Sequence, residues 1–225
     1  MITATTRLIA LLGRPVARSL SPRMQNAAFA ALALDLAYVA FDVAPERFDE
    51  AVRALAELGF AGANVTAPHK RAAATLAGSG EPSVNTLVFR AGRIEGHSTD
   101  AAVLTGLSPE RPAIVGGGGS AAAFARALPQ ARRFERRGDW PPTVDGADLV
   151  VHATPVRDEV LVRVGAGQTL VDLPYPGSAT AAAAREAGAT VYDGLDVLVA
   201  QGAASFELWT GLPAPVDVMR AAIRE

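Results

Sequence analysis

Short apolar runs alternate with helical segments along most of this chain, and this alternation constrains the fold more than any other feature. Strands are predicted at residues 7–12, 36–43 and 62–65, and helices at residues 21–34, 45–58 and from residue 68 onward. Ser21 is predicted to cap the first helix, with Pro22 at its first helical position. Strands that alternate with helices form parallel sheets, so the first half of the chain predicts an α/β unit.

The alternation resumes after a predicted β-hairpin, in which residues 86–90 and 94–97 flank a short turn at residues 91–93. A helical connector is expected from Asp100 to Leu107. A second α/β unit is predicted to follow, with strands at residues 113–115, 132–135, 148–152 and 169–173. An alanine-rich helix ending at residue 128 follows its first strand, and residues 138–142 are predicted to form a loop. Two helices, at residues 195–209 and 216–224, are predicted to close the chain.

A glycine-rich turn lies between the strand and the helix that open this second unit. Gly116, Gly118 and Ala121 fit the pattern G-x-G-x-x-A, and Gly119 and Ser120 complete the turn. Bare glycines let a pyrophosphate approach the backbone N–H groups of a helix N-terminus, whose dipole favours negative charge. The pattern therefore indicates dinucleotide binding. Its alternative is a flexible glycine turn, since short glycine patterns also match by chance.

Lys70 is the only lysine among the 21 basic residues of the chain. It lies in the first turn of a predicted helix that follows the strand ending at Val65, and ligands bind at such carboxyl ends of parallel strands. A cation there opposes the helix dipole, and arginine cannot exchange a proton as lysine can. These features favour proton transfer by Lys70 over a solvated surface role. Asp100, just before a helical stretch, is either an N-cap or a functional acid.

Composition excludes several function classes. A formal net charge of -2 and a pI near 6.0 provide no basic excess for nucleic acid or an anionic membrane, and no long uncharged apolar stretch or signal peptide is found. We therefore expect a cytoplasmic monomer or homodimer with a small-molecule partner. The chain has no cysteine, and its 3 histidines lack metal-ligand spacing, so surface or capping roles and no metal are expected. No G-x-S-x-G elbow supports a serine hydrolase.

Several motifs together resemble those of the shikimate dehydrogenase family (shikimate/quinate 5-dehydrogenase type), in the family's order and over nearly the whole chain. Residues 13–26 are similar to its opening substrate loop, 64–70 to its N-V-T-x-P-x-K signature, 84–86 to its A-V-N-T and 96–100 to its G-x-N-T-D. Residues 172–176, 194–201 and 206–211 are similar to its closing segments.

This resemblance implies an α/β fold with an N-terminal substrate domain, a shortened Rossmann-like nucleotide-binding domain, and C-terminal helices that return to the substrate domain. The implied boundaries are 1–102 plus 200–225 for the substrate-binding catalytic domain and 103–199 for the dinucleotide-binding domain. The implied reaction is the reversible NADP-dependent reduction of 3-dehydroshikimate to shikimate, a step of the chorismate pathway and of aromatic amino-acid biosynthesis. The alternatives are a dehydrogenase of quinate or another hydroxylated ring acid, and a family member that binds ligands without turning them over.

The resemblance also implies which residues form the site. Lys70 and Asp100 would be the catalytic pair, and Ser19 and Ser21 would bond the substrate carboxylate. The remaining substrate-binding residues would be Asn64, Thr66, Asn85, Tyr175 and Gln201. The cofactor-binding residues would be Gly116, Gly118, Gly119, Ser120, Ala121, Arg136, Arg137 and Thr154.

Some positions depart from the family pattern. Ser98 and His152 stand where the family usually has Asn, and Gly202 stands where Ala is common. The glycine loop reaches Ala153 in fewer than 40 residues, which predicts that one βα unit of the nucleotide domain is missing.

Two features of the sequence disagree about the nucleotide. Arg136 and Arg137 follow a predicted strand at the place where the family has the arginine that meets the NADP 2′-phosphate. Glu135, however, lies about 20 residues beyond the glycine loop, where an acid bonds the ribose of NAD and repels a phosphate. The sequence predicts NADP, with NAD as the alternative.

Overall fold

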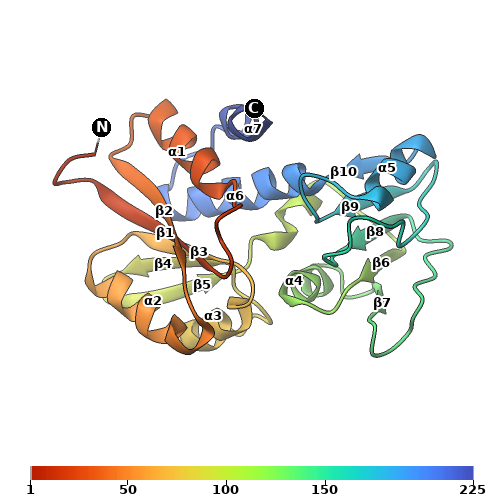
Figure 1. Cartoon of the computed structure of the whole chain (residues 1–225), viewed down its shortest axis with the longest axis horizontal. Helices are drawn as coiled ribbons and strands as arrows, with labels where there is room; N and C mark the ends of the chain where they lie inside the picture. Colours follow the sequence, from red (N-terminus) through yellow and green to blue (C-terminus); the bar gives the residue numbers. More distant parts are fainter. Residues whose placement is uncertain (1, 225) are drawn as a thin grey trace. The chain divides into compact units, whose positions relative to one another are not determined.

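The computed structural model describes residues 2–224, which form two compact units (Figure 1). The first unit holds the residues up to Thr99 and those from Val199 onward, and the second holds Asp100–Leu198. The expected outer domain ends, residues 1 and 225, lie outside the described residues. No helix within residues 2–224 is both long and apolar enough to cross a membrane.

The first unit is built on a mixed five-stranded sheet with the order β2-β1-β3-β4-β5. The strands are β1 (Arg7–Gly13), β2 (Leu36–Asp42), β3 (Gly62–Val65), β4 (Thr86–Arg90) and β5 (Arg93–His97). The first three are parallel, and β4 and β5 form the predicted antiparallel hairpin. Both residues of its turn, Ala91 and Gly92, have positive φ (48° and 76°), as a type I′ hairpin turn requires.

Helices cover both faces of this sheet. They are α1 (Ser21–Ala31), the 3₁₀ turn η1 (Pro45–Arg47), α2 (Phe48–Glu57), α3 (Lys70–Ala77), the part of α6 (Gly194–Thr210) that lies in this unit, and α7 (Val216–Arg224). Figure 1 shows α2 and α3 on one side of the sheet and α1 and α7 on the other. Phe48 and Val52 of α2 belong to one buried cluster, and Phe29 of α1 stacks on Phe206 of α6 at 5.6 Å between ring centroids.

The start and end of α1 differ from the prediction. The N-cap is Leu20, so Ser21 is the first helical residue and its predicted capping role is wrong. The Ser21 N–H donates to the Ser19 hydroxyl at 3.3 Å, and no side-chain hydrogen bond caps α1. The helix ends at Ala31 rather than at Leu34, because Ala33 turns into the left-handed region with φ 50°.

The second unit contains a fully parallel five-stranded sheet with the order β10-β9-β8-β6-β7. Its elements are η2 (Asp100–Leu104), β6 (Pro112–Val115), α4 (Gly119–Ala127), β7 (Arg132–Phe134), β8 (Leu149–His152), β9 (Thr169–Asp172), α5 (Ala179–Glu186) and β10 (Thr190–Tyr192). The predicted connector is a 3₁₀ turn that ends at Leu104 instead of a helix to Leu107. α5 and β10 had no counterpart in the sequence prediction.

Loops take the place of helices on two connections of this sheet. Residues 135–148 join β7 to β8 and residues 153–168 join β8 to β9, and neither segment contains a helix. Their side chains still bury apolar surface, since Val144 and Val162 pack in one cluster with Val150 of β8 and Ala181 of α5. A full dinucleotide-binding sheet has six strands, so this five-stranded sheet agrees with the expected loss of one βα unit.

Candidate active site

Parallel strands of the first unit deliver two predicted site segments to one edge of the sheet. β1 and β3 are parallel neighbours, so the segments that follow them, 14–20 and 66–70, leave the sheet at the same edge. The first segment carries Ser19, which is half-buried, and leads to Ser21, which is buried. The second carries Thr66 and Lys70.

The hairpin adds two more segments at this edge. β4 runs antiparallel to β3 with Thr86 opposite Asn64, so Asn85, just before β4, lies where β3 ends. β5 ends at His97 opposite Thr86, and the chain therefore passes through Thr99 at the same place. The fold thus gathers four motifs that are far apart in the sequence.

Asn64 connects several of these elements through its side chain, which is only 5% exposed. Its Oδ1 accepts a hydrogen bond from the Tyr38 hydroxyl at 2.8 Å. Its Nδ2 lies within donating distance of the Asn85 carbonyl (3.0 Å), Thr86 Oγ1 (3.1 Å) and Ser205 Oγ (3.0 Å). Both ends of the amide are therefore used inside the fold, where they fix the position of β3 relative to β4 and α6.

Asn85 organises the neighbouring part of the edge. Its Oδ1 accepts the Thr99 N–H at 2.7 Å, and its Nδ2 donates to Thr99 Oγ1 at 2.9 Å and to Gln201 Oε1 at 3.2 Å. Thr99 Oγ1 and Ser205 Oγ both lie within donating distance of the Gln201 carbonyl, at 3.0 and 2.8 Å. The predicted residues Asn64, Asn85 and Gln201 thus belong to one buried polar network.

Sequence reasoning missed the hydroxyl and phenol groups that complete this network, which are those of Tyr38, Thr86, Thr99 and Ser205. Ser205 had a detectable signal, because it lies four residues after Gln201 on α6 and therefore on the same helix face. Tyr38 had none, because only the pairing of β1 with both β2 and β3 brings it near Asn64.

Lys70 lies in the first turn of α3, as predicted, and is half-buried, but the helix begins at Lys70 itself and not at the predicted residue 68. The preceding His69 is buried; its Nε2 lies 2.8 Å from the Val43 carbonyl oxygen, and its ring stacks on Phe48 at 4.7 Å. A carbonyl only accepts, so Nε2 carries the proton. The surface role expected for His69 is wrong. His69 is the N-cap residue of α3, but its side chain makes no capping hydrogen bond; its ring instead anchors the start of α3 and thereby the backbone of Lys70.

Thr66 closes the turn between β3 and α3. Its N–H donates to the Leu12 carbonyl at 2.9 Å, and its carbonyl accepts the His69 N–H at 2.9 Å. Its methyl group packs so closely over Gly13 that a Cβ at that glycine would lie 2.2 Å from Thr66 Cγ2. The end of β1 is therefore a place where only glycine fits.

Two of the residues predicted for catalysis and substrate binding belong to the second unit. Asp100 is buried, starts η2, and follows directly after Thr99, whose backbone is bound by Asn85. Tyr175 is half-buried in the loop between β9 and α5.

The glycine loop of the second unit has the shape that a pyrophosphate needs. Gly116 has φ 135°, and a Cβ there would lie 2.5 Å from the Ala153 carbonyl oxygen, so the position accepts only glycine. Gly118 is the N-cap of α4, and a Cβ there would meet no atom within 4 Å. No side chain caps α4 and no acidic residue occupies its first turn, so the helix N-terminus suits an anion. The loop fits a dinucleotide better than an unspecific glycine turn.

The remaining predicted residues of this loop lie where the pattern requires them. Gly119 and Ser120 are the first two residues of α4 and are half-buried, whereas Ala121 is buried. A small residue at Ala121 therefore lets α4 pack closely.

A cluster of charges follows β7. Glu135 is half-buried, and its carboxylate lies against the glycine loop, since a Cβ at Gly117 would be 2.9 Å from Glu135 Oε2. The Arg133 guanidinium pairs with Glu135 at 3.1 Å. Arg136 and Arg137 are exposed, and the Arg136 guanidinium lies 5.6 Å from the centre of the Trp140 ring. An acid and two arginines therefore stand beside the loop together.

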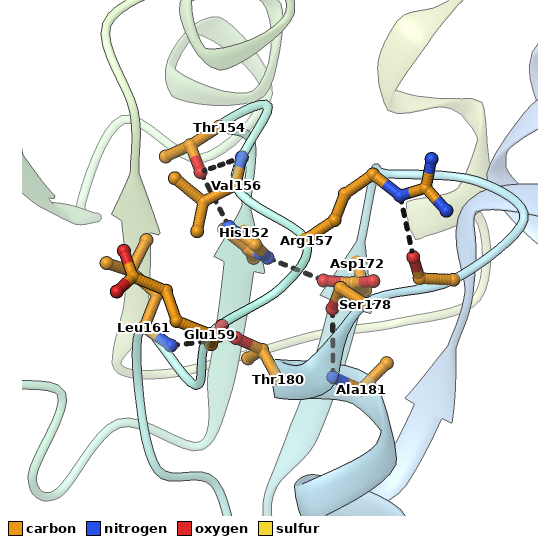
Figure 2. A network of polar contacts seen from close by, with 11 residues as sticks. His152, Thr154, Val156, Arg157, Glu159, Leu161, Asp172, Ser178, Thr180 and Ala181 are labelled. Carbon is orange, nitrogen blue, oxygen red and sulfur yellow. Dashed lines mark hydrogen bonds and ion pairs between the residues drawn. The ribbon is translucent and has the colours of Figure 1, made fainter.

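His152 and Asp172 form a buried pair at the ends of β8 and β9, as Figure 2 shows. His152 Nδ1 lies 2.6 Å from Asp172 Oδ1, and His152 Nε2 lies 2.7 Å from Thr154 Oγ1. The surface or capping role expected for His152 is wrong, because the neighbouring strand and the Thr154 loop enclose it completely. Among residues 2–224 no group of His, Asp and Glu side chains has the arrangement of a metal site.

Comparison with known proteins places the chain in a family. One family model, the shikimate dehydrogenase substrate binding domain, matches residues 11–87, and a second, the shikimate 5′-dehydrogenase C-terminal domain, matches residues 194–224. A shikimate dehydrogenase (NADP(+)) of Anaeromyxobacter sp. (strain K) is 41% identical over 270 aligned positions, which cover 98% of this chain and 97% of the relative. The chain belongs to the shikimate dehydrogenase family.

Solved structures of the family share the whole fold. Shikimate dehydrogenase from Aquifex aeolicus superposes with a TM-score of 0.89 at 28% identity, with full coverage of both chains. The enzyme from Thermus thermophilus in complex with NADP(H) and shikimate has a TM-score of 0.81 at 29% identity and covers 97% of this chain and 98% of the other. The predicted family and fold class are confirmed.

The family matches also locate the residues discussed above. The substrate-domain match at residues 11–87 contains Ser19, Asn64, Lys70 and Asn85, and the second match contains Gln201. The alignment with the Anaeromyxobacter relative has more positions than this chain has residues, so the relative contains segments that this shorter family member lacks.

Proposed function

We propose that this protein catalyses the reversible, NADP-dependent reduction of 3-dehydroshikimate to shikimate, in the cytoplasm and as a step of aromatic amino-acid biosynthesis. The relatives with 41% identity, named shikimate dehydrogenase (NADP(+)), support the reaction and the nucleotide. The family structure with NADP(H) and shikimate supports the substrate class.

The placement of Lys70 carries the proposal. It is the only lysine of the chain, it starts α3 at the edge where β1 and β3 end, and His69 anchors the backbone beneath it. A structural role does not explain a cation at a helix N-terminus, because the helix dipole opposes it. A group that must stabilise a developing oxyanion and exchange a proton explains both the position and the choice of lysine over arginine.

Reduction of the ring ketone adds a hydride to the carbonyl carbon and a proton to the carbonyl oxygen, so that the C=O group becomes a secondary alcohol. Lys70 donates a hydrogen bond to that oxygen and supplies the proton, and Asp100 orients the resulting hydroxyl. The nicotinamide supplies the hydride when the nucleotide is bound.

The polar network at the sheet edge holds the substrate-binding groups in place. Ser19 and Ser21 bind the substrate carboxylate, and the substrate hydroxyls bind to the residues Asn64, Thr66, Asn85, Tyr175 and Gln201. Asn64 and Asn85 are 5% and 2% exposed, so beside their contact with the substrate they also fix the neighbouring elements. Because the hydrogen bonds inside this network are already formed, the polar atoms that the network does not use are held in place before the substrate arrives. Such preorganisation favours tight and selective binding.

The second unit provides the nucleotide site. The pyrophosphate binds at the N-terminus of α4, against the glycine loop of residues 116–119, with Ser120 and Ala121 in the first turn. Arg136 and Arg137 bind the 2′-phosphate of NADP, and Thr154 contacts the nucleotide from the loop after β8. The carboxylate of Glu135 opposes that phosphate, which leaves room for activity with NAD.

A dehydrogenase assay tests the proposal. Absorbance at the nicotinamide band is followed with shikimate and with quinate, each with NADP⁺ and with NAD⁺. We expect the highest kcat/KM with shikimate and NADP⁺. Faster turnover of quinate would assign the chain to the related ring-acid dehydrogenases, and binding of shikimate without turnover of either acid would make it a non-catalytic member. Light scattering of the same sample separates monomer from homodimer.

A matched pair of variants ties any activity to the site. Lys70→Ala removes the proposed catalytic amine, whereas Arg53→Ala removes an exposed cation on α2. Loss of activity in the first variant alone supports the assignment. Equal activity in both would refute it.

A further inference from the structure

The strands β8 and β9 end on a polar pair that follows buried apolar residues, Val150 and Val151 in β8 and Leu170 and Val171 in β9. His152 and Asp172 are register partners on adjacent parallel strands, so their side chains lie on the same face of the sheet. Both side chains are 0% exposed, and Nδ1 of the histidine lies 2.6 Å from Oδ1 of the aspartate (Figure 2). Burial of two such groups costs free energy that a pair of apolar side chains would not cost.

The hydrogen-bonding capacity of the pair is also not fully used. The second carboxylate oxygen of Asp172, Oδ2, is buried and has no hydrogen-bond partner within residues 2–224. A buried polar group with an unpaired atom destabilises a fold, so stability gives no reason for this choice of residues.

The other nitrogen of the ring reaches out of the pair. His152 Nε2 lies 2.7 Å from Thr154 Oγ1, which also accepts the Val156 N–H at 3.2 Å. A neutral ring that donates from Nδ1 to Asp172 accepts the threonine O–H at Nε2, whereas an imidazolium donates to the threonine oxygen. In both states the rotation of the Thr154 hydroxyl is fixed. One hydrogen-bonding position of this hydroxyl then remains for a ligand: an acceptor lone pair when the ring is neutral, and the O–H proton when the ring is an imidazolium.

Thr154 lies beside the glycine loop. The preceding Ala153 donates its N–H to the Val115 carbonyl at 2.8 Å, and its own carbonyl is the atom that excludes a side chain at Gly116. The loop after β8 is tied further along to the start of α5, because the Ala179 N–H donates to the Arg157 carbonyl at 2.7 Å. The backbone around Thr154 is therefore held at both ends, and its hydroxyl is held by the histidine.

We propose that His152 and Asp172 are positioning residues that orient the Thr154 hydroxyl toward the nicotinamide dinucleotide. The inference rests on the proposed function, because it requires a nucleotide at the glycine loop. Asp172 fixes the ring through Nδ1, the ring fixes the threonine through Nε2, and the threonine uses its remaining valence on a polar atom of the nucleotide. Neither His152 nor Asp172 touches a reacting atom.

Three variants and one control separate this role from a structural one, and the measured quantity is the Kd of NADP⁺ by calorimetry. Thr154→Val removes the hydroxyl and raises the Kd about 5- to 10-fold, the effect of one neutral hydrogen bond. His152→Asn keeps a donor near the Nδ1 position but does not reach the threonine, so it raises the Kd by the same factor. In His152→Gln the side-chain amide reaches the position of the histidine Nε2, so we expect a Kd within about twofold of that of the parent.

A double variant gives the sharpest result. If the histidine acts only through the threonine, His152→Asn adds no further increase in Kd to Thr154→Val. In turnover assays the KM for NADP⁺ follows the Kd, and kcat stays within about twofold of the parent. The control is Thr180→Val, which removes a buried hydroxyl that accepts the Leu161 N–H; it lowers the thermal midpoint and leaves the Kd unchanged.

The outcomes separate the two hypotheses. If the parent binds NADP⁺ and either Thr154→Val or His152→Asn binds it equally well, the positioning role is wrong while the proposed function stands. If His152→Asn does not fold, the Thr154→Val and His152→Gln measurements still decide, since Thr154 is half-buried at the sheet edge rather than in the core. If the parent itself does not bind the nucleotide, the proposed function fails.

Discussion

Replacement of Gly118 by alanine tests whether the loop before α4 binds a pyrophosphate. This residue has φ -81° and ψ -176°, which any amino acid adopts, and a Cβ there would meet no protein atom within 4 Å. The fold therefore tolerates the methyl group. As an N-cap, alanine is less favourable than glycine by at most about 1 kcal/mol.

The same methyl group would occupy the space through which phosphate oxygens approach the backbone N–H groups of α4. Loss of one hydrogen bond to a charged group costs about 1.5 to 3 kcal/mol, which corresponds to a Kd increase of roughly 10- to 150-fold. We expect Gly118→Ala to weaken NADP⁺ binding by a factor in this range, with a thermal midpoint close to that of the parent.

Gly116→Ala is the matched comparison. Its φ of 135° and the 2.5 Å approach to the Ala153 carbonyl oxygen leave no room for a side chain, and the obstacle is backbone rather than a flexible side chain. We expect a strain of about 1 to 3 kcal/mol or more, a clearly lower thermal midpoint and weaker binding together.

Calorimetric titration with NADP⁺ and thermal unfolding followed by circular dichroism measure the two effects separately. Binding within twofold of the parent by Gly118→Ala would refute the placement of the pyrophosphate. A Gly116→Ala protein as stable as the parent would refute the backbone argument.

Four other substitutions have defined expected outcomes. Lys70→Arg keeps the charge but cannot exchange a proton, so kcat should fall about 10²-fold or more at an unchanged thermal midpoint; near-parent activity would end the acid/base assignment. Glu135→Gln removes the carboxylate beside the glycine loop, so the ratio of kcat/KM with NADP⁺ to that with NAD⁺ should rise at least about fivefold. Gly202→Ala places a Cβ 2.2 Å from the Met24 terminal methyl carbon, so urea unfolding should show a loss of about 1 kcal/mol despite the better helix propensity. Burial raises the pKa of Asp148, but hydrogen bonds from backbone N–H groups, first those of Glu110 and Arg111 and then its own and that of Leu149, together leave the pKa below its usual value. Its ionised form therefore stabilises the fold above pH of about 4, and the deficit of Asp148→Asn in urea should shrink as the pH falls through the lower, folded pKa.

Local sequence patterns predicted most strands and helices because their physical causes are local. The hairpin of β4 and β5 and the run of β1 to β3 follow from apolar runs bounded by turn residues. α5 was missed because its sequence, Ala179–Glu186, is mostly alanine and has no clear apolar periodicity. β10 was missed because three residues carry too little pattern.

Motifs predicted the position of the candidate site better than they predicted the burial of its residues. Asn64 and Asn85 lie close together because Asn64 belongs to β3 and Asn85 directly precedes β4, and these two strands pair. The enclosure of His152 was not foreseen, although it ends an apolar strand and Asp172 ends the next, because burial depends on the pairing of strands 20 residues apart in sequence. The mistaken cap at Ser21 has a similar origin, since capping depends on the backbone angles at Leu20.

The two connections of the second unit that lack helices affect how this unit opens. Residues 135–148 and 153–168 contribute Val144 and Val162 to the core, yet their backbone N–H groups lack the repeating bonds of a helix. Amide hydrogens in these loops should therefore exchange with solvent through small local openings, and proteases should cut there before the sheets unfold. Because Glu135, Arg136 and Thr154 lie on the same loops, a bound nucleotide would slow both processes.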